Sequence, residues 1–129
     1  MKNKITIAIQ RKGRLFENSK NLLNKSGVNF TTAGEKLLAR SSNMDVDILL
    51  VRDDDIPSLV SNGVADLGIV GQNVLAEQIA TNKKISARSI LKLGFSKCNL
   101  AFAKPLNSKL RSLKNKTIAT SYPGLVKNY

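Results

Sequence analysis

The chain has 129 residues, of which 42% are hydrophobic and 23% are charged, and its formal net charge is +12 at pH 7. This composition excludes a disordered tail, a collagen-like repeat and a disulfide-stapled miniprotein. One cysteine and no histidine exclude a His/Cys zinc site and imidazole catalysis. Because the sequence has neither a membrane-length apolar run nor a signal-peptide pattern, we expect a cytoplasmic protein.

The first third of the chain alternates strand and helix patterns. Residues 4–9 alternate with a period of two and predict a strand, and a polar turn over residues 10–14 follows. Apolar residues at helical spacing then predict a helix that begins at Leu15 and is closed by Gly27. The sequence beyond it predicts further strands over residues 28–31, 36–41 and 46–51, the last of them an apolar run typical of a strand buried in a sheet.

The pattern continues over the next thirty residues. A proline early in a helical stretch predicts a helix from about Pro57 to Asn62, followed by a short strand over residues 67–70 and a helix over residues 74–80. Strands that alternate with helices through short links predict an α/β fold with an open sheet of parallel strands.

The last fifty residues carry a different pattern. They predict strands over residues 85–91 and 97–104, a basic connection over 105–116, a short strand over 116–120 and a helix that starts at Pro123. We therefore expect a first α/β lobe over residues 1–104 and the start of a second lobe over residues 105–129, whose remainder this chain lacks.

The positive charge lies mostly in this last part. Residues 1–77 hold all nine acidic residues and ten basic ones, whereas residues 78–129 hold eleven basic residues and no acidic one. The basic residues stand singly between apolar ones, without aromatic platforms or an arginine-rich run. A solvated basic surface that attracts anionic substrates is therefore favoured over nucleic-acid binding, which sequence-independent attraction to phosphates would otherwise suggest.

The loop between the first strand and the first helix is the first candidate site. In open α/β sheets, ligands bind beyond the carboxyl ends of the strands, where loop amides and helix N-termini face an anion. Gly13 permits a close approach of the backbone, and Arg11, Lys12 and Arg14 are charged donors for phosphate. Local chemistry alone leaves a phosphate site and a solvated turn equally open.

The acidic run after the strand over residues 46–51 is the second candidate. Consecutive carboxylates at Asp53, Asp54 and Asp55 repel one another unless a cation, a metal-bound phosphate or a helix N-terminus receives them. Capping of the following helix by Asp53 or Asp54 is expected to account for at least one of them, and an accessory Mg²⁺ role is the alternative. Arg52 is a candidate phosphate donor.

Two further segments hold residues suited to binding. Gly68 inside a strand indicates a close approach by another backbone or a ligand, and Gly71 before a helix offers amides to an anion, with helix–sheet packing as the alternative. Residues 120–123 offer hydroxyls and free amides at another helix N-terminus, with a simple N-cap as the alternative. Cys98, in an apolar strand-like run, is predicted to be a packed, unreactive thiol.

Taken in order, four of these segments resemble the ATP phosphoribosyltransferase family, whose reaction opens histidine biosynthesis. The matching stretches are residues 7–15 (IAIQRKGRL), 47–57 (DILLVRDDDIP), 66–75 (DLGIVGQNVL) and 118–123 (IATSYP). They span nearly the whole chain in the family's order. The RDDDIP form resembles the long branch of the family, whose subunits carry a C-terminal histidine-sensing domain.

The resemblance implies a fold and a reaction. The fold is like that of the type II periplasmic binding proteins, with two lobes and an active site in the cleft between them. The reaction joins N1 of ATP to C1 of phosphoribosyl pyrophosphate and releases pyrophosphate, with Mg²⁺ bound mainly through the substrate phosphates. The resemblance further implies a homo-oligomer at full length, a dimer or hexamer, with neither nucleic acid nor membrane as partner. The alternative is a non-catalytic two-lobed module that binds a small anion or a nucleotide.

The resemblance also implies roles for individual residues. Lys12 matches the basic residue of the family's first loop and would stabilise phosphate or departing pyrophosphate. Many long-form relatives carry Lys-Ser-Gly here, so the choice among Arg11, Lys12 and Arg14 as the phosphate contact stays open. The remaining substrate-binding candidates are Gln10, Gly13, Arg52, Asp53, Asp54, Gly71, Gln72, Asn73, Ser121 and Tyr122, and no residue is assigned as a metal ligand. Because the family's phosphoribosyl-pyrophosphate loop lies beyond residue 129, we expect the 129-residue chain to be an inactive fragment.

Overall fold

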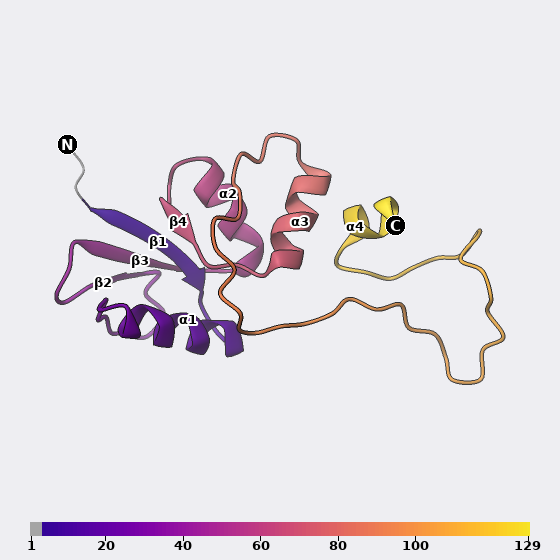
Figure 1. Ribbon diagram of the computed structural model, residues 1–129, viewed down its shortest axis with the longest axis horizontal. Helices are drawn as coiled ribbons and strands as arrows, with labels where there is room; N and C mark the ends of the chain where they lie inside the picture. Colours follow the sequence, from indigo (N-terminus) through magenta and orange to yellow (C-terminus); the bar gives the residue numbers. More distant parts are fainter. Residues whose placement is uncertain (1–3) are drawn as a thin grey trace.

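A four-stranded sheet organises the first part of the chain in the computed structural model (Figure 1). The structure describes residues 4–129, so residues 1–3 of the N-terminal stretch in which no signal-peptide pattern was found lie outside the described residues. The strand order is β2-β3-β1-β4, with strands β1 (Ile5–Gln10), β2 (Leu38–Arg40), β3 (Val46–Val51) and β4 (Leu67–Gly68). β1 pairs in parallel with both β3 and β4, whereas β2 runs antiparallel to β3.

The α/β class predicted from the sequence is confirmed, but the prediction of an all-parallel sheet is wrong at the β2 edge. Residues 41–45 link β2 to β3 and are too few for the crossover that a parallel pair requires, so the chain reverses as a hairpin.

The helices are α1 (Arg14–Lys25), α2 (Ile56–Ser61), α3 (Gln72–Thr81) and α4 (Pro123–Asn128), with a 3₁₀ turn η1 (Asp53–Asp55) directly before α2. α1 lies on one face of the sheet and α2 on the other, whereas α4 lies beside α3 (Figure 1). The predicted helices in these regions are therefore confirmed. Gly27 follows α1 with a φ of 92°, the left-handed conformation expected of a residue that closes a helix.

Side-chain alternation along β1 divides the core into two clusters. Ile7 and Ile9 point to the α1 face, where they pack with Leu23 of the helix, whereas Ala8 points to the other face and packs with Ile56 of α2. Ile9 and Ile56 are fully buried. The sheet is therefore fixed from both sides, and the carboxyl ends of its parallel strands remain at one edge.

Several predicted strands do not form. Residues 28–31 pair with no strand, although Val28 and Phe30 are buried in the α1-side cluster, so their alternation reflects packing alone. Residues 85–91, 97–104 and 116–120 also form no strand. A strand needs a hydrogen-bonded neighbour, and within residues 4–129 no ladder forms along these stretches.

Residues 83–122, the extended segment, contain neither helix nor strand. The segment leaves the sheet, runs far from it and returns to bring α4 beside α3 (Figure 1). The accessible surface of the chain is 9865 Å², whereas a compact monomer of this mass exposes about 6,700 Å². Ile90 and Leu106 in this segment are 73% and 98% exposed.

No helix found between residues 4 and 129 is both long and apolar enough to cross a membrane.

Candidate functional site

Three of the candidate segments meet at the carboxyl edge of the parallel strands. Gln10 lies opposite Val51 in the β1–β3 register, so the loops that follow these strands begin side by side. The N–H of Arg11 donates to the carbonyl oxygen of Val51 over 2.8 Å, which ties the first loop to the start of the acidic run. β4 is in register with β1 and leads within a few residues to Gly71. This edge is where ligands bind in open α/β sheets.

Two helices that begin at this edge have glycine N-caps. Gly13 caps α1 and Gly71 caps α3, and neither helix has a side-chain capping hydrogen bond. The φ of Gly13 is 90°, so the turn itself favours glycine. Because no side chain satisfies the first-turn N–H groups of α1 and α3, these groups are available to the oxygens of an anion.

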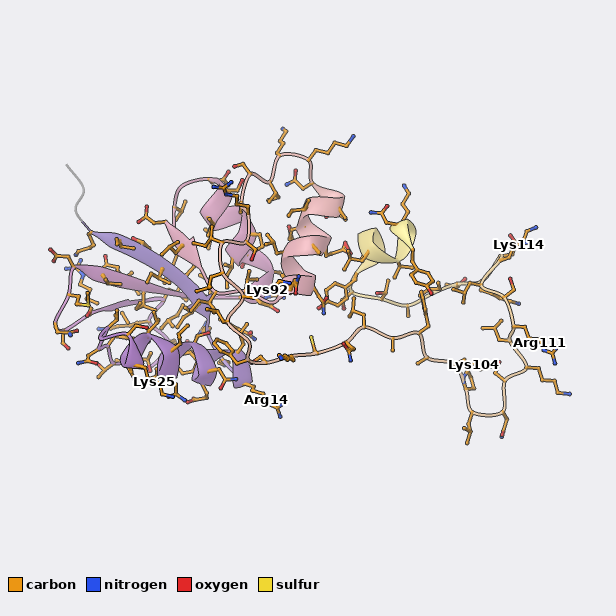
Figure 2. The ribbon with its side chains drawn as sticks, viewed as in Figure 1. Arg14, Lys25, Lys92, Lys104, Arg111 and Lys114 are labelled. Atoms are coloured by element: carbon orange, nitrogen blue, oxygen red, sulfur yellow. The ribbon has the colours of Figure 1, made fainter. Side chains whose placement is uncertain are left out.

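A pocket of about 310 Å³ opens beside the first loop. Two of the three candidate cations, Arg11 and Lys12, line it, whereas Arg14 does not. Figure 2 shows Arg14 pointing away from the sheet at the start of α1. The full lining is Arg11, Lys12, Phe16, Thr32, Gly34, Glu35, Lys36 and Leu50. Lys36 is a cation that the sequence did not single out, because it lies in a predicted strand far from any motif.

The acidic run forms a local turn of its own. The Asp53 carboxylate accepts a hydrogen bond of 2.9 Å from the N–H of Asp54. Arg52 Nη2 lies 3.8 Å from Asp54 Oδ2, and both side chains are strongly exposed, so this ion pair adds little stability. The prediction that Asp53 or Asp54 caps the following helix is wrong. Because η1 intervenes, the N-cap of α2 is Asp55, whose side chain makes no capping hydrogen bond.

Tyr122 lies at the N-cap of α4, and its hydroxyl is influenced by residues that are distant in the sequence. Burial raises the pKa of its hydroxyl above the ordinary 10.0, and nearby Asp53, Cys98, Asp54 and Glu77 raise it further, in that order. The charges of the acidic run therefore act on a phenol that is nearly seventy residues away in sequence. The hydroxyl is therefore protonated at neutral pH and can donate a hydrogen bond there.

Asn73 lies in the first turn of α3, directly after the N-cap Gly71 and Gln72. Its Nδ2 donates to the sulfur of Cys98 over 3.4 Å, which fastens the extended segment to the first turn of α3. Cys98 is exposed, so the prediction of a packed thiol is wrong; the strand expected to bury it does not form. Gln72 and Ser121 are exposed, and they directly precede Asn73 and Tyr122 in the chain.

Glu77 is the residue that sequence reasoning missed. It is only 7% exposed, and its carboxylate accepts hydrogen bonds of 2.9 Å from the N–H groups of Gly124 and Leu125. The prediction of free amides after residues 120–123 is therefore wrong, because Glu77 takes them. A signal was present in the sequence: Glu77 follows the apolar Val74 by three residues, which places a charge on the buried face of the helix.

The arrangement offers two carboxylates, Asp53 and Asp54, close to the edge of the sheet. Among residues 4–129, no group of three or more acidic or cysteine side chains lies close enough together to hold a metal ion.

The labelled basic side chains of the extended segment are spread along its length, with Lys92 close to α3 in the view of Figure 2. Figure 2 shows Lys104, Arg111 and Lys114 on the distant part of the segment, whereas Arg14 and Lys25 lie at opposite ends of α1. Lys104 Nζ donates to the carbonyl oxygen of Leu110 over 3.1 Å, a contact within the segment itself. Lys104, Arg111 and Lys114 therefore lie away from the first loop.

Comparison with known proteins gives consistent matches. A family model described as "HisG: ATP phosphoribosyltransferase" matches residues 52–129. An ATP phosphoribosyltransferase of Maricaulis maris is 44% identical over 133 aligned residues, covering 100% of this chain and 45% of its own length. One of Bacteroides thetaiotaomicron is 45% identical over 128 residues, covering 97% and 44%. The chain thus spans less than half the length of either protein.

A solved structure is similar as well. The "ATP phosphoribosyl transferase (HisG:HisZ) complex from Thermotoga maritima" contains a chain with 36% sequence identity and a TM-score of 0.49. The match covers 58% of this chain and 35% of that one.

Proposed function

The chain belongs to the ATP phosphoribosyltransferase family, and on that premise we propose that the protein transfers the phosphoribosyl group of phosphoribosyl pyrophosphate to N1 of ATP. The products are phosphoribosyl-ATP and pyrophosphate, and the reaction is the first step of histidine biosynthesis. The observation that carries the proposal is the family match over residues 52–129, and the two relatives that align with nearly all of the chain support it.

The proposed reaction replaces one bond at C1 of the ribose by another. The lone pair of adenine N1 forms a bond to C1, and the bond from C1 to the pyrophosphate oxygen breaks, its electron pair leaving with pyrophosphate. Negative charge therefore grows on the leaving group in the transition state. Donors held in place before the reaction stabilise such charge most effectively.

The first loop has the groups that this step needs. Lys12 is proposed as the catalytic residue that stabilises the phosphate or the departing pyrophosphate, and Arg11 lines the same pocket. The N–H groups at the start of α1 have no side-chain cap and add dipoles of the same sign. Gln10, Gly13 and Arg14 complete the loop.

The other candidates are proposed to bind the rest of the substrates. Gly71, Gln72 and Asn73 would contact the nucleotide at the start of α3, and Arg52 would donate to phosphate. Ser121 and Tyr122 would face the same cleft from the other side. The protonated Tyr122 hydroxyl and the Asn73 amide are both suited to hydrogen bonds with a polar substrate.

Mg²⁺ is proposed to enter bound mainly through substrate phosphates. Magnesium typically takes one or two protein carboxylates together with phosphate oxygens, and Asp53 and Asp54 offer such a pair at the edge of the sheet. When bound, the ion would neutralise phosphate charge. The protein's own part is to hold those carboxylates in the η1 turn, where the N–H of Asp54 orients Asp53.

The wider architecture is proposed by the same reasoning. Residues 1–104 would belong to a first lobe and residues 105–129 to a second, in a two-lobed fold like that of the type II periplasmic binding proteins. The active protein would be a cytoplasmic homo-oligomer.

The test uses the protein purified from its source organism. With ATP, phosphoribosyl pyrophosphate and Mg²⁺ present, we expect an ultraviolet absorbance change and phosphoribosyl-ATP by mass spectrometry. Omitting phosphoribosyl pyrophosphate, or replacing ATP by an analogue methylated at N1, should abolish the change. A well-folded protein that forms no product contradicts the proposal, and saturable ATP binding without turnover would favour the non-catalytic binding module instead.

A further inference from the structure

One face of α3 fastens two segments that are distant in sequence. Asn73 and Glu77 are four residues apart and therefore lie one above the other on the same side of the helix. Asn73 bonds Cys98 of the extended segment, and Glu77 bonds the first turn of α4. The start of α4 is therefore held one helical turn from a candidate nucleotide contact.

The first turn of α4 is completely satisfied by this contact. Pro123 has no N–H, and the N–H of Val126 donates to the carbonyl oxygen of Tyr122 within the helix. The two remaining N–H groups, those of Gly124 and Leu125, donate to Oε2 and Oε1 of Glu77, each over 2.9 Å. Both carboxylate oxygens are therefore used, and the orientation of α4 relative to α3 is fixed at two points.

The burial of Glu77 shows that this contact balances its charge. Neither ion pair found among residues 4–129 includes Glu77, so its carboxylate is stabilised by the two N–H groups and the positive end of the helix. A buried carboxylate without partners would be costly. The contact is therefore strongly favoured over an open arrangement.

Glycine at position 124 permits the close approach. A Cβ built there would lie 2.7 Å from Glu77 Oε2 and 2.6 Å from Cγ2 of Thr81. Any larger residue would push α4 away from α3. The hydrogen bonds and the absent side chain thus act on the same spacing between the two helices.

We propose that Glu77 is a positioning residue that holds Ser121 and Tyr122 at the substrate site by fixing the N-terminus of α4 against α3. The proposal rests on the proposed function, because it takes Ser121 and Tyr122 as substrate contacts. Glu77 itself does not touch substrate. Its removal should therefore weaken substrate binding through α4 and leave the chemistry of the first loop in place.

The first test measures the contact without any substrate. In ¹⁵N-labelled protein, Glu77→Gln should speed amide hydrogen exchange at Gly124 and Leu125 by at least about tenfold, because the charge that strengthens both hydrogen bonds is lost. Glu17→Gln makes the same chemical change at an exposed position and should leave both amides unchanged. Unchanged exchange in Glu77→Gln would overturn the proposal. Gly124→Ala should speed exchange at Leu125 as well, which gives a second route if Glu77→Gln folds poorly.

The second test separates positioning from a purely structural role. In the protein purified from its source organism, Glu77→Gln should raise the KM for the substrates by about tenfold and change kcat less than about threefold. Equal losses in kcat and kcat/KM, or no change in KM when amide exchange shows that the contact is lost, would overturn the proposal. Wild-type protein without turnover would contradict the proposed function alone, because the exchange measurement does not depend on activity.

Discussion

Gly68 in the edge strand β4 gives the sharpest test of the packing between α2 and the sheet. A Cβ built at this position would lie 2.5 Å from Cγ2 of Ile56 and 3.1 Å from Cγ2 of Val60. Real Cβ atoms essentially never come within 3.0 Å of a non-bonded heavy atom of a residue that is not adjacent in the chain, so Gly68→Ala forces α2 or β4 to move. The sequence predicted another backbone or a ligand close to Gly68, with helix–sheet packing as the alternative, and the structure has the alternative, because the nearest atoms belong to α2 side chains.

The cost of this substitution follows from how little the neighbour can yield. Ile56 is fully buried and β-branched, so its methyl group has no free rotamer to adopt. Inserting a methyl group into such a site costs about 1–3 kcal/mol. We expect Gly68→Ala to lower the free energy of unfolding by about 2 kcal/mol, seen as a decrease of roughly 1 M in the urea midpoint with an unchanged slope.

Gly71→Ala is the matched control. Its φ of −61° suits any residue, and its nearest contact would be Val74 Cγ2 at an ordinary 3.7 Å, so only the N-cap preference for glycine is lost and stability should fall by less than about 1 kcal/mol. In an Ile56→Ala background, Gly68→Ala should cost far less, because the clashing methyl group is gone. A Gly68→Ala protein as stable as wild type would show that β4, as an edge strand, moves freely, and the packing argument would fail.

Three further predictions concern other parts of the chain. Lys12→Ala should lower turnover by roughly 10²–10³-fold and leave the urea midpoint unchanged, since the side chain is exposed; normal turnover would transfer the role to Arg11. Tyr129 is the other of the two tyrosines, so in a Tyr129→Phe protein absorbance titration reports on Tyr122 alone and should place its pKa above 10.0. The folded state then binds more protons than the unfolded state above that pH, so stability should fall as pH rises through this range, and an inflection at or below 10.0 would refute the assignment. Asp66→Ala should destabilise by about 1–3 kcal/mol, because Asp66 Oδ2 accepts the N–H of a buried β1 residue over 2.9 Å; Asp66→Asn, which retains an acceptor oxygen, should recover most of the loss in the same urea assay.

The sequence predicts the sheet well where local patterns and tertiary packing agree. The alternation in β1, the apolar run of β3 and the Gly27 helix end are local signals, and each corresponds to an element of the structure. The stretches over residues 85–91 and 97–104 carry similar apolar patterns but form no strand. A strand pattern indicates how a segment would pack against a neighbour and not whether that neighbour is present.

The candidate site shows the same limit. The carboxyl-edge rule depends only on strand direction and predicted the first loop as a site, whereas the meeting of that loop with the acidic run and Gly71 follows from the strand order of the structure. The use of the α4 amides by Glu77 depends on a contact between residues 47 positions apart. That pairing has no local signature beyond a charged residue on an apolar helix face, so the sequence indicated free amides where the structure has bonded ones.

The central position of β1 has a consequence for how the chain folds. β1 is synthesised first, yet its partners are Val46–Val51 on one side and Leu67–Gly68 on the other. Ile7 pairs with Leu67, so at translation rates of about 5–20 residues per second roughly 3–12 s pass before its second neighbour is made. Closing loops of this length also slows folding, because their entropy is lost before the strand contacts form. During synthesis β1 is therefore the strand of the sheet that waits longest for its neighbours, and both of its edges stay unpaired for that time.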